Sequence, residues 1–278
     1  MNSMSTIAIT AADVNKLRTI TGAGMMDCKK ALTEAEGDFE KAIDILRKKG
    51  QKVAANRSDR DAKEGYVIAK TAANTAVVLS LNCETDFVAK NADFGALATS
   101  FLDAALNNKA QSLEQVLAIN MADGRSIQDH VTDAVGKIGE KIEISSYGLV
   151  TGESVVAYNH PGNRVATIVA FNKVTDENMA KDVAMQAAAM SPIALDKDDV
   201  SQEVLDRELE IAKDQVRAEG KPEDMVEKIA LGKVNKFYKE STLNNQEFIK
   251  DNKKTVAQYV QEGDKDRKIV AFKRIALG

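Results

Sequence analysis

Apolar residues in the first fifty positions recur at the spacing of short α-helices, between residues that commonly start and end helices. The segment therefore predicts three helices. The residues that start or end them are Thr10, Gly22, Gly24, Gly37, Asp38 and, at the end of the third helix, Gly50. The residues expected on their inward faces are Val14, Leu17, Cys28, Leu32, Ala35, Phe39, Ala42, Ile43 and Leu46. We expect a small three-helix domain over residues 1–50.

A β-hairpin followed by helices is predicted for the next part of the chain. Residues 51–64 come first, and because they are polar and have no apolar face they indicate a linker or an exposed continuation of the third helix. The expected elements are strands at 66–70 and 76–81 around a turn at Asn74, helices at about 93–107, 112–119 and 127–138, and a strand that opens at Ile142. They would form a first α+β subdomain over residues 65–148.

The order strand, turn, strand and helix returns after residue 155, which indicates an internal duplication. The expected elements are strands at 155–158 and 164–171 and a helix with Met179, Val183, Ala187 and Met190 on its inner side. Asn82-x-x-Thr85-Asp86 matches Asn172-x-x-Thr175-Asp176 at an offset of 90 residues. Each Thr-Asp pair would then form a polar turn that caps a helix. The second α+β subdomain would comprise residues 149–200 and 240–278.

Residues 201–239, between the two pieces of this subdomain, carry two amphipathic helical stripes separated by Gly220-Lys221-Pro222. They predict an antiparallel helical hairpin. Its other faces are charged, so two interpretations stay open: a solvated arm, or a contact for a partner or for a second copy of the chain, which would make a dimer. A helix at 256–260 and a strand at 269–273 should return to the core.

Two apolar segments sit where solvated residues would be expected. Phe87-Val88 follows the first Thr-Asp turn, whereas Glu177-Asn178 follows the second, so the turn itself does not require a phenylalanine. Either Phe87 folds back onto the core, or it protrudes as a wedge for another protein. Met26 likewise falls on the outer face of its helix, either as a partly covered residue at the helix start or as a flexible contact for a partner.

Composition and charge restrict the class of function. The net charge is −4 and no block of Lys and Arg lacks neighbouring acids, so nucleic acid is not expected as a main ligand. The two cysteines, Cys28 and Cys83, offer neither a disulfide framework nor zinc spacing, which suits a reducing compartment such as the cytoplasm. The N-terminus lacks the pattern of a signal peptide, and no apolar run has the ~20 residues of a membrane span.

Residues able to carry out chemistry are sparse. His130 and His160 belong to no HExxH, CxxC or Ser/His arrangement, and no phosphate-binding glycine loop or nucleophile elbow occurs. Asp86 near Glu84 could be an acid/base pair, but carboxylates are common in capping turns. The residues therefore favour a binding protein over an enzyme, with no cofactor expected.

Two long stretches closely resemble the signatures of the elongation factor Ts family. The first is Leu17-Arg18-x-x-Thr21-Gly22-Ala23-Gly24-Met25-Met26-Asp27-Cys28-Lys29-Lys30-Ala31-Leu32, and the second is Asn82-Cys83-Glu84-Thr85-Asp86-Phe87-Val88-Ala89-Lys90. Shorter matches are Lys137-Ile138-Gly139-Glu140, Ala184-Met185-Gln186-x-Ala188-Ala189, Gly220-Lys221-Pro222 and Lys236-Phe237-x-x-Glu240. The resemblance covers nearly the whole chain.

The resemblance implies an architecture: a ubiquitin-associated-like three-helix domain, a linker, and two related α+β subdomains with a helical hairpin inserted in the second. It also implies a function, namely nucleotide exchange on the translational GTPase elongation factor Tu, bound to GDP or free of nucleotide, in the cytoplasm. Asp86 and Phe87, flanked by Thr85 and Val88, would enter the GTPase domain near its magnesium and switch region.

Further contacts with the partner follow from the same resemblance. Arg18, Met25 and Met26 would contact a helix beside the guanine pocket, and Gln186, which stands where some relatives carry His, is a further expected contact. The main alternative in another class is an adaptor whose three-helix domain captures ubiquitin-like or other partners.

Overall fold

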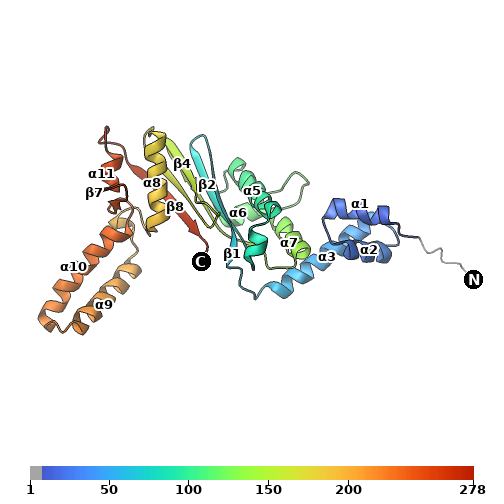
Figure 1. The fold of residues 1–278 in the computed structure, drawn as a ribbon, viewed down its shortest axis with the longest axis horizontal. Coiled ribbons are helices and arrows are strands. Elements are labelled where there is room, and N and C mark those ends of the chain that lie inside the picture. Colours follow the sequence, from blue (N-terminus) through green and yellow to red (C-terminus); the bar gives the residue numbers. More distant parts are fainter. Residues whose placement is uncertain (1–7) are drawn as a thin grey trace, which may run out of the picture.

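Two antiparallel sheets of three strands each form the centre of the chain in the computed structural model, which describes residues 8–278 (Figure 1). The first sheet has the order β1 (Glu64–Ala72), β2 (Thr75–Cys83), β3 (Glu143–Thr151), and the second has the order β4 (Ser154–Asn159), β5 (Val165–Phe171), β8 (Ile269–Ala276). The expectation of no signal peptide falls mainly on residues 1–7, which lie outside the described residues.

The two sheets pack face to face through small apolar side chains. The residues buried between them are Val67, Ala69, Ala76, Val78 and Val150 from the first sheet and Ala166, Ile168 and Ala170 from the second. Every residue of β2 is buried, because this strand lies between β1 and β3 and is covered on both faces. Both sheets place the second strand of a hairpin at their centre, as the repeated sequence pattern suggests.

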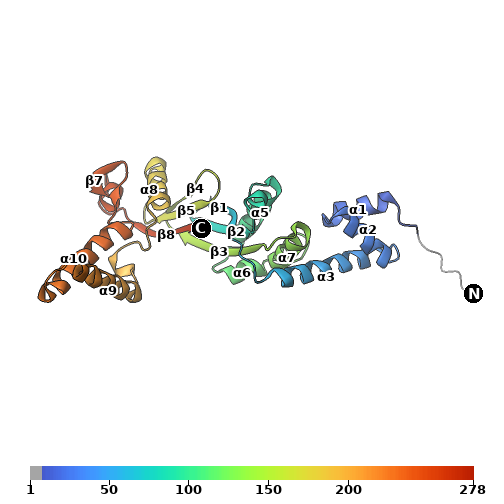
Figure 2. The same ribbon diagram turned by 60° about the horizontal axis from the view of Figure 1, so that its bottom comes forward.

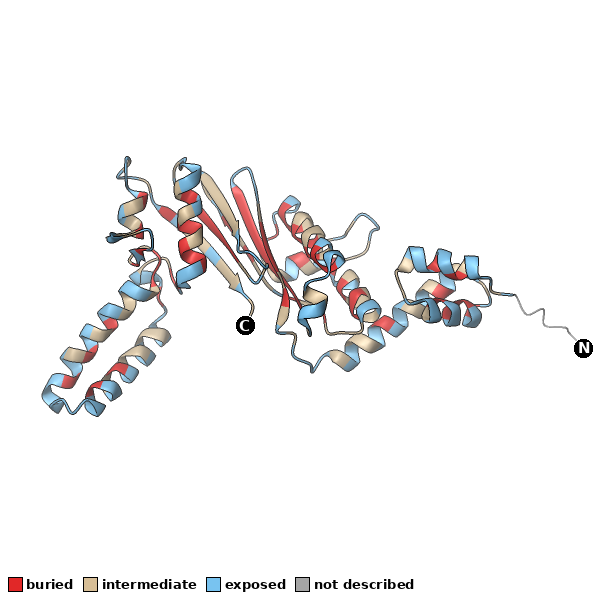
Figure 3. Ribbon diagram, in the orientation of Figure 1, coloured by how far each residue is buried: buried red, intermediate tan, exposed pale blue. Residues whose placement is uncertain are grey.

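Helices cover the outer faces of the two sheets, so the molecule has the layer order helix, sheet, sheet, helix (Figures 1 and 2). The first sheet shares a core with α5 (Ala92–Asn107), α6 (Leu113–Ala118) and α7 (Ile127–Ile138). The second sheet shares a core with α8 (Glu177–Met190) and α11 (Val256–Val260). Figure 3 shows that burial is concentrated on the strands and the inner helix faces. Met190 departs from expectation because its side chain is exposed at the end of α8.

The N-terminal helices are α1 (Ala11–Thr21), α2 (Met25–Glu34) and α3 (Phe39–Arg57), and they enclose the small core that the sequence predicts. Thr10 caps α1 through a capping box, and Gly22 ends it in the left-handed conformation with φ 66°. The prediction that Gly50 ends the third helix is wrong. Helix α3 continues to Arg57, because Gly50 is buried against the backbone of Gly136 in α7 instead of facing solvent. The alternative of a continuing helix is correct up to Arg57.

A helical hairpin formed by α9 (Gln202–Ala218) and α10 (Glu223–Ser241) projects from the end of the molecule that carries α8, β7 and α11 (Figure 1). The two helices bury Ala212, Val216, Val226, Ala230 and Val234 along their contact, as the sequence pattern predicts. A short 3-10 helix, η1 (Lys197–Asp199), precedes the hairpin. Two short strands follow the hairpin, β6 (Glu247–Phe248) and β7 (Asp251–Thr255), and the sequence analysis does not predict them.

Candidate protein-binding site

Phe87 is the most exposed large apolar side chain in residues 8–278, with 87% of its surface accessible. It lies in α4 (Asp86–Ala89), a single helical turn between β2 and α5 in which no residue is buried. The alternative that Phe87 folds back onto the core is therefore wrong. Large aromatic side chains are usually at least partly buried, so this degree of exposure indicates a surface that another molecule covers.

The neighbours of Phe87 fix the turn and supply its charge. Thr85 is the N-cap of α4, and its hydroxyl accepts a hydrogen bond from the backbone N–H of Val88 at 3.4 Å. Val88 is half-buried against the core beneath the first sheet, so it anchors the turn from below. The side chain of Asp86 is exposed and accepts a 2.6 Å hydrogen bond from Lys90, which lowers the pKa of its carboxyl group. Asp86 is therefore an ionised residue in the first turn of α4, directly after the N-cap.

Glu84 and Glu140, for which the sequence suggested no binding role, join the start of this turn to the segment that follows α7. One carboxylate oxygen of Glu140 accepts from the backbone N–H groups of Glu84 and Thr85, each at 3.1 Å, and the other accepts from the Thr85 hydroxyl at 2.7 Å. In the opposite direction, Glu84 accepts from the backbone N–H of Lys141 at 2.7 Å. We call these four residues, Glu84, Thr85, Glu140 and Lys141, the glutamate clasp.

Arginines from the N-terminal part of the chain reach the same clasp. Arg57, the last residue of α3, donates to Glu84 at 3.0 and 3.3 Å, and Arg60 donates at 3.2 Å. The pKa of Glu84 lies below its ordinary value, first because the Lys141 N–H donates to its carboxylate and next because both arginines do. An ionised carboxylate therefore joins β2, the turn after α7 and the end of α3.

A second exposed apolar group lies at the turn between α1 and α2. Met25 and Met26 occupy the first turn of α2 and are 54% and 66% exposed, so the outward position expected for Met26 is confirmed. Arg18, in the last turn of α1, is also exposed, as is Ile20 at 57%, which the sequence analysis did not single out. Arg18, Ile20, Met25 and Met26 are called the N-terminal patch below.

The end of α7 links the N-terminal patch to the turn that carries Phe87. A β-carbon on Gly22, between α1 and α2, would lie 2.5 Å from the ammonium nitrogen of Lys137 in the last turn of α7. Helix α7 ends at Gly139 in the left-handed conformation, and the next residue is Glu140 of the clasp. Residues at the end of α7 therefore support both the N-terminal patch and the turn that carries Phe87.

Gln186 lies elsewhere and is fully buried in α8. Its side-chain amide donates to Gln246 at 3.2 Å and to the backbone carbonyl of Glu247 at 3.1 Å, while its oxygen accepts from the N–H of Ile249 at 2.9 Å. All of these partners belong to this chain. The structure thus places Gln186 among structural residues and apart from Phe87 and the N-terminal patch.

The polar groups around α4 line an open surface hollow. Its volume is about 510 Å³, and its lining includes Tyr66, Asp86, Lys90, Gly95 and Arg164. Arg164 is paired with Glu64, and Asp86 with Lys90, so both cations of the hollow are neutralised. An open hollow with paired charges beside an exposed aromatic side chain suits a protein surface better than an enclosed small ligand.

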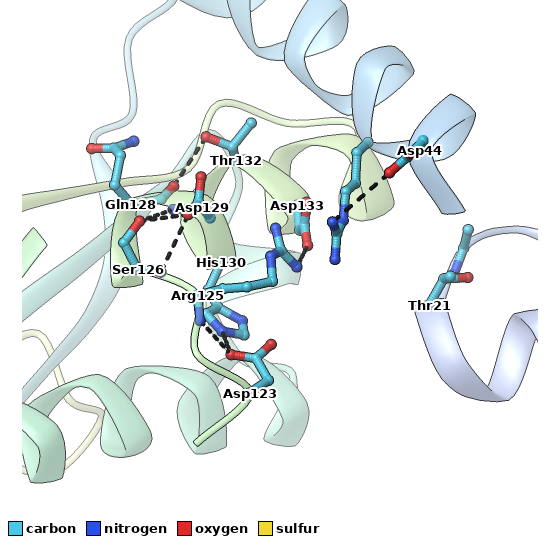
Figure 4. Close-up of polar contacts among 12 residues, drawn as sticks. Thr21, Asp44, Asp123, Arg125, Ser126, Gln128, Asp129, His130, Thr132 and Asp133 are labelled. Atoms are coloured by element: carbon cyan, nitrogen blue, oxygen red, sulfur yellow. Dashed lines mark hydrogen bonds and ion pairs between the residues drawn. The ribbon is translucent and has the colours of Figure 1, made fainter. Parts of the chain in front are cut away.

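The histidines take part in local structure. His130 Nε2 lies 3.1 Å from Asp123 Oδ1, and Arg125 pairs with Asp133 at 2.5 Å, which fixes the loop before α7 to that helix (Figure 4). His160 lies 3.0 Å from the hydroxyl of the neighbouring tyrosine of β4. Across residues 8–278, no group of three or more His, Cys, Asp or Glu side chains is placed to hold a metal ion. In the same range, no helix has the length and apolar character needed to cross a membrane.

Comparison with known proteins gives consistent matches along the chain. A family model described as "Elongation factor TS" matches residues 84–278. "Elongation factor Ts" of Porphyromonas gingivalis is 49% identical over 271 residues, which cover 98% of this chain and 99% of that protein. The protein of the same description from Cytophaga hutchinsonii is 53% identical over 279 residues, covering 99% and 100%. That from Flavobacterium psychrophilum is 53% identical over 274 residues, covering 97% and 99%.

Proposed function

The chain belongs to the elongation factor Ts family of translation elongation factors, and we propose that it promotes release of GDP from elongation factor Tu by inserting Phe87 into the GTPase. The observation that carries this proposal is the 87% exposure of Phe87 on a turn held rigidly at its base. No covalent bond is made or broken, so the protein acts as an exchange factor and not as an enzyme. Its action takes place in the cytoplasm, with translation.

Phe87 works by binding one conformation of the GTPase better than another. Inserted near the magnesium and switch region, it stabilises a state in which the contacts to magnesium and phosphate are disturbed. Asp86 and the half-buried Val88 support it from either side. An aromatic side chain that fills a pocket of the partner is a common anchor of protein interfaces.

The N-terminal patch binds the same GTPase at a second place, beside the guanine pocket. Met25 and Met26 are flexible apolar side chains that adapt to a partner surface, and Arg18 adds a charged donor beside them. Two contacts on one rigid frame hold the GTPase from both ends of its nucleotide site. The three-helix part of the chain thus serves as a binding domain of the ubiquitin-associated type, attached to a core of two related α+β subdomains.

Thermodynamic linkage sets the direction of exchange. If binding of this protein lowers the affinity of elongation factor Tu for GDP by some factor, binding of GDP lowers the affinity of elongation factor Tu for this protein by the same factor. Binding of GTP then displaces the protein and leaves the GTPase loaded. The nucleotide present in excess determines the product of the cycle.

The test is stopped-flow release of fluorescent GDP from elongation factor Tu. The wild type should accelerate release, and Phe87→Ala should accelerate it at least about tenfold less, the effect of losing ~1.4 kcal/mol at one interface anchor. Val174→Ala is the matched control, because Val174 is also apolar and 74% exposed but lies outside the proposed contacts. Equal acceleration by Phe87→Ala would refute the wedge. No acceleration by the wild type would refute exchange and favour an adaptor.

A further inference from the structure

We propose that Glu140 is the positioning residue of the Phe87 turn and that the glutamate clasp couples the direction of Phe87 to the N-terminal patch. This inference rests on the proposed function, because it explains how two separate contact groups keep a fixed relationship while they bind one GTPase. Glu140 itself does not need to touch the partner. It acts through Thr85 and through the first turn after β2.

The turn that carries Phe87 needs support from outside. Helix α4 has only four residues, Asp86–Ala89, none of them buried, and an isolated helix shorter than ~12 residues is marginal in water. Its own N-cap bond, from the Val88 N–H to the Thr85 hydroxyl, is 3.4 Å long. Packing contributes only through the half-buried Val88 and Ala89. Other contacts must therefore fix the direction of Phe87.

Glu140 supplies those contacts through three hydrogen bonds to two consecutive residues. The backbone N–H groups of Glu84 and Thr85 both point at one carboxylate oxygen, and the Thr85 hydroxyl donates to the other. Hydrogen bonds to an ionised carboxylate are shorter and stronger than bonds between neutral groups. These bonds also give hydrogen-bond acceptors to two backbone N–H groups, those of Glu84 and Thr85, directly after the end of β2. One side chain thus fixes the path by which the chain leaves β2 towards Phe87.

The return half of the clasp binds the N-terminal helices to the same point. Glu84 accepts from the Lys141 N–H and from Arg57, so the end of α3 is joined to residues on both sides of the clasp. Helix α3 belongs to the bundle that presents Met25 and Met26. Lys137, three residues before Glu140, lies against Gly22 between α1 and α2. Movement of the clasp would therefore shift Phe87 relative to the N-terminal patch.

A double-mutant cycle on the full chain tests this role. The variants are Glu140→Ala, Phe87→Ala and the combination of both, and the readouts are the maximal rate of GDP release from elongation factor Tu and the concentration of factor at half saturation. Glu140→Ala should lower the maximal rate about fivefold or more, the effect of coupling between residues of one network. In the Phe87→Ala background the same change should have no further effect on the maximal rate.

Additive losses would overturn the proposal, because they would show that Glu140 acts independently of Phe87. An unchanged maximal rate with Glu140→Ala would overturn it as well, while leaving the proposed function intact as long as Phe87→Ala still loses activity. A wild type that does not accelerate release would instead refute the proposed function. Glu153→Ala is the control, since Glu153 is an exposed carboxylate outside both contact groups.

Conservative variants distinguish positioning from general stability. In Glu140→Gln the amide oxygen can still accept from both N–H groups, and the amide nitrogen can donate to the Thr85 hydroxyl, so most of the maximal rate should return. If Glu140→Ala does not fold, Thr85→Val removes the hydroxyl bond to Glu140, together with the long N-cap bond that the same hydroxyl accepts from Val88, and keeps both backbone N–H bonds to Glu140. It should lower the maximal rate in the same direction. A folded Thr85→Val variant with the maximal rate of the wild type, or Glu140→Gln as inactive as Glu140→Ala, would contradict the proposal.

Discussion

Gly136 of α7 lies so close to Gly50 of α3 that a β-carbon on Gly136 would stand 2.7 Å from the Cα atom of Gly50. The contact is asymmetric. A β-carbon on Gly50 would find its nearest neighbours, the Gly136 Cα atom and the Thr132 carbonyl oxygen, at 3.7 Å, which is ordinary van der Waals contact. The backbones of the two helices therefore meet directly, and only one of the two glycines is required by space.

Gly136→Ala should destabilise the protein by about 1–3 kcal/mol, because the added methyl group meets backbone that must move. Gly50→Ala should be neutral or stabilising by up to about 1 kcal/mol, since alanine favours the helix and fits the space. Urea unfolding followed by circular dichroism measures both. Gly232→Ala in the exposed part of α10, where nothing lies within 4 Å, provides the stabilising control. Equal damage from Gly50→Ala and Gly136→Ala would contradict the asymmetry.

Much of the fold follows from local patterns in the sequence. The hairpins, α5, α7 and α11 lie at or within a few residues of the predicted positions, because apolar periodicity and capping residues agree there. The end of α3 could not be predicted from the local sequence. Gly50 locally favours a helix end, but its contact with α7 keeps it inside the helix. Strands β6 and β7 are short and mostly polar, so they carry no alternating pattern.

The candidate site could be predicted in part. Comparison of the Phe87 turn with the second Thr-Asp turn did not determine whether the Phe87 side chain is buried or exposed. The structure shows that it is exposed. The sequence did not indicate the role of Glu140, because its partner Thr85 lies 55 residues away along the chain. Local periodicity does not relate positions that far apart. The burial of Gln186 depends on Ile249, 63 residues further along the chain. Contacts of this kind become visible only in three dimensions.

The contribution of Glu84 to stability should depend on pH. The pKa of Glu84 is lowered in the folded state, so its ionised form stabilises the fold. This contribution is present in full when the pH is above the ordinary glutamate pKa. That contribution is lost as the pH falls from the ordinary value towards the lowered one. The destabilisation caused by Glu84→Gln should therefore be largest near neutral pH and should shrink below about pH 4.5. Urea unfolding of both proteins across this range measures it, with Glu153→Gln as a control. A pH-independent difference would argue against an ionised clasp.

Cys83 should resist alkylation in the folded protein. Its thiol is buried beneath the Phe87 turn and donates to the Thr85 carbonyl at 3.1 Å, and burial raises its pKa to about 12. The thiolate that reacts with iodoacetamide is therefore almost absent near neutral pH. Mass spectrometry should find Cys83 unmodified in native protein and modified in urea. Rapid native labelling would show that the turn opens.

Gln186 should affect stability and not exchange. Gln186→Leu keeps most of the side-chain volume but leaves the Ile249 N–H and the Glu247 carbonyl without their partner in a buried site. We expect a loss of about 2–4 kcal/mol in unfolding free energy, from two or more buried polar groups left unpaired. Gln128→Leu, on the exposed face of α7, should change stability by less than about 0.5 kcal/mol. The rate of GDP release at saturating factor, per folded molecule, should match the wild type for both variants. A stable Gln186→Leu protein with a reduced rate would mean that this buried amide becomes a partner contact, which would require α8 and the segment around Ile249 to separate on binding.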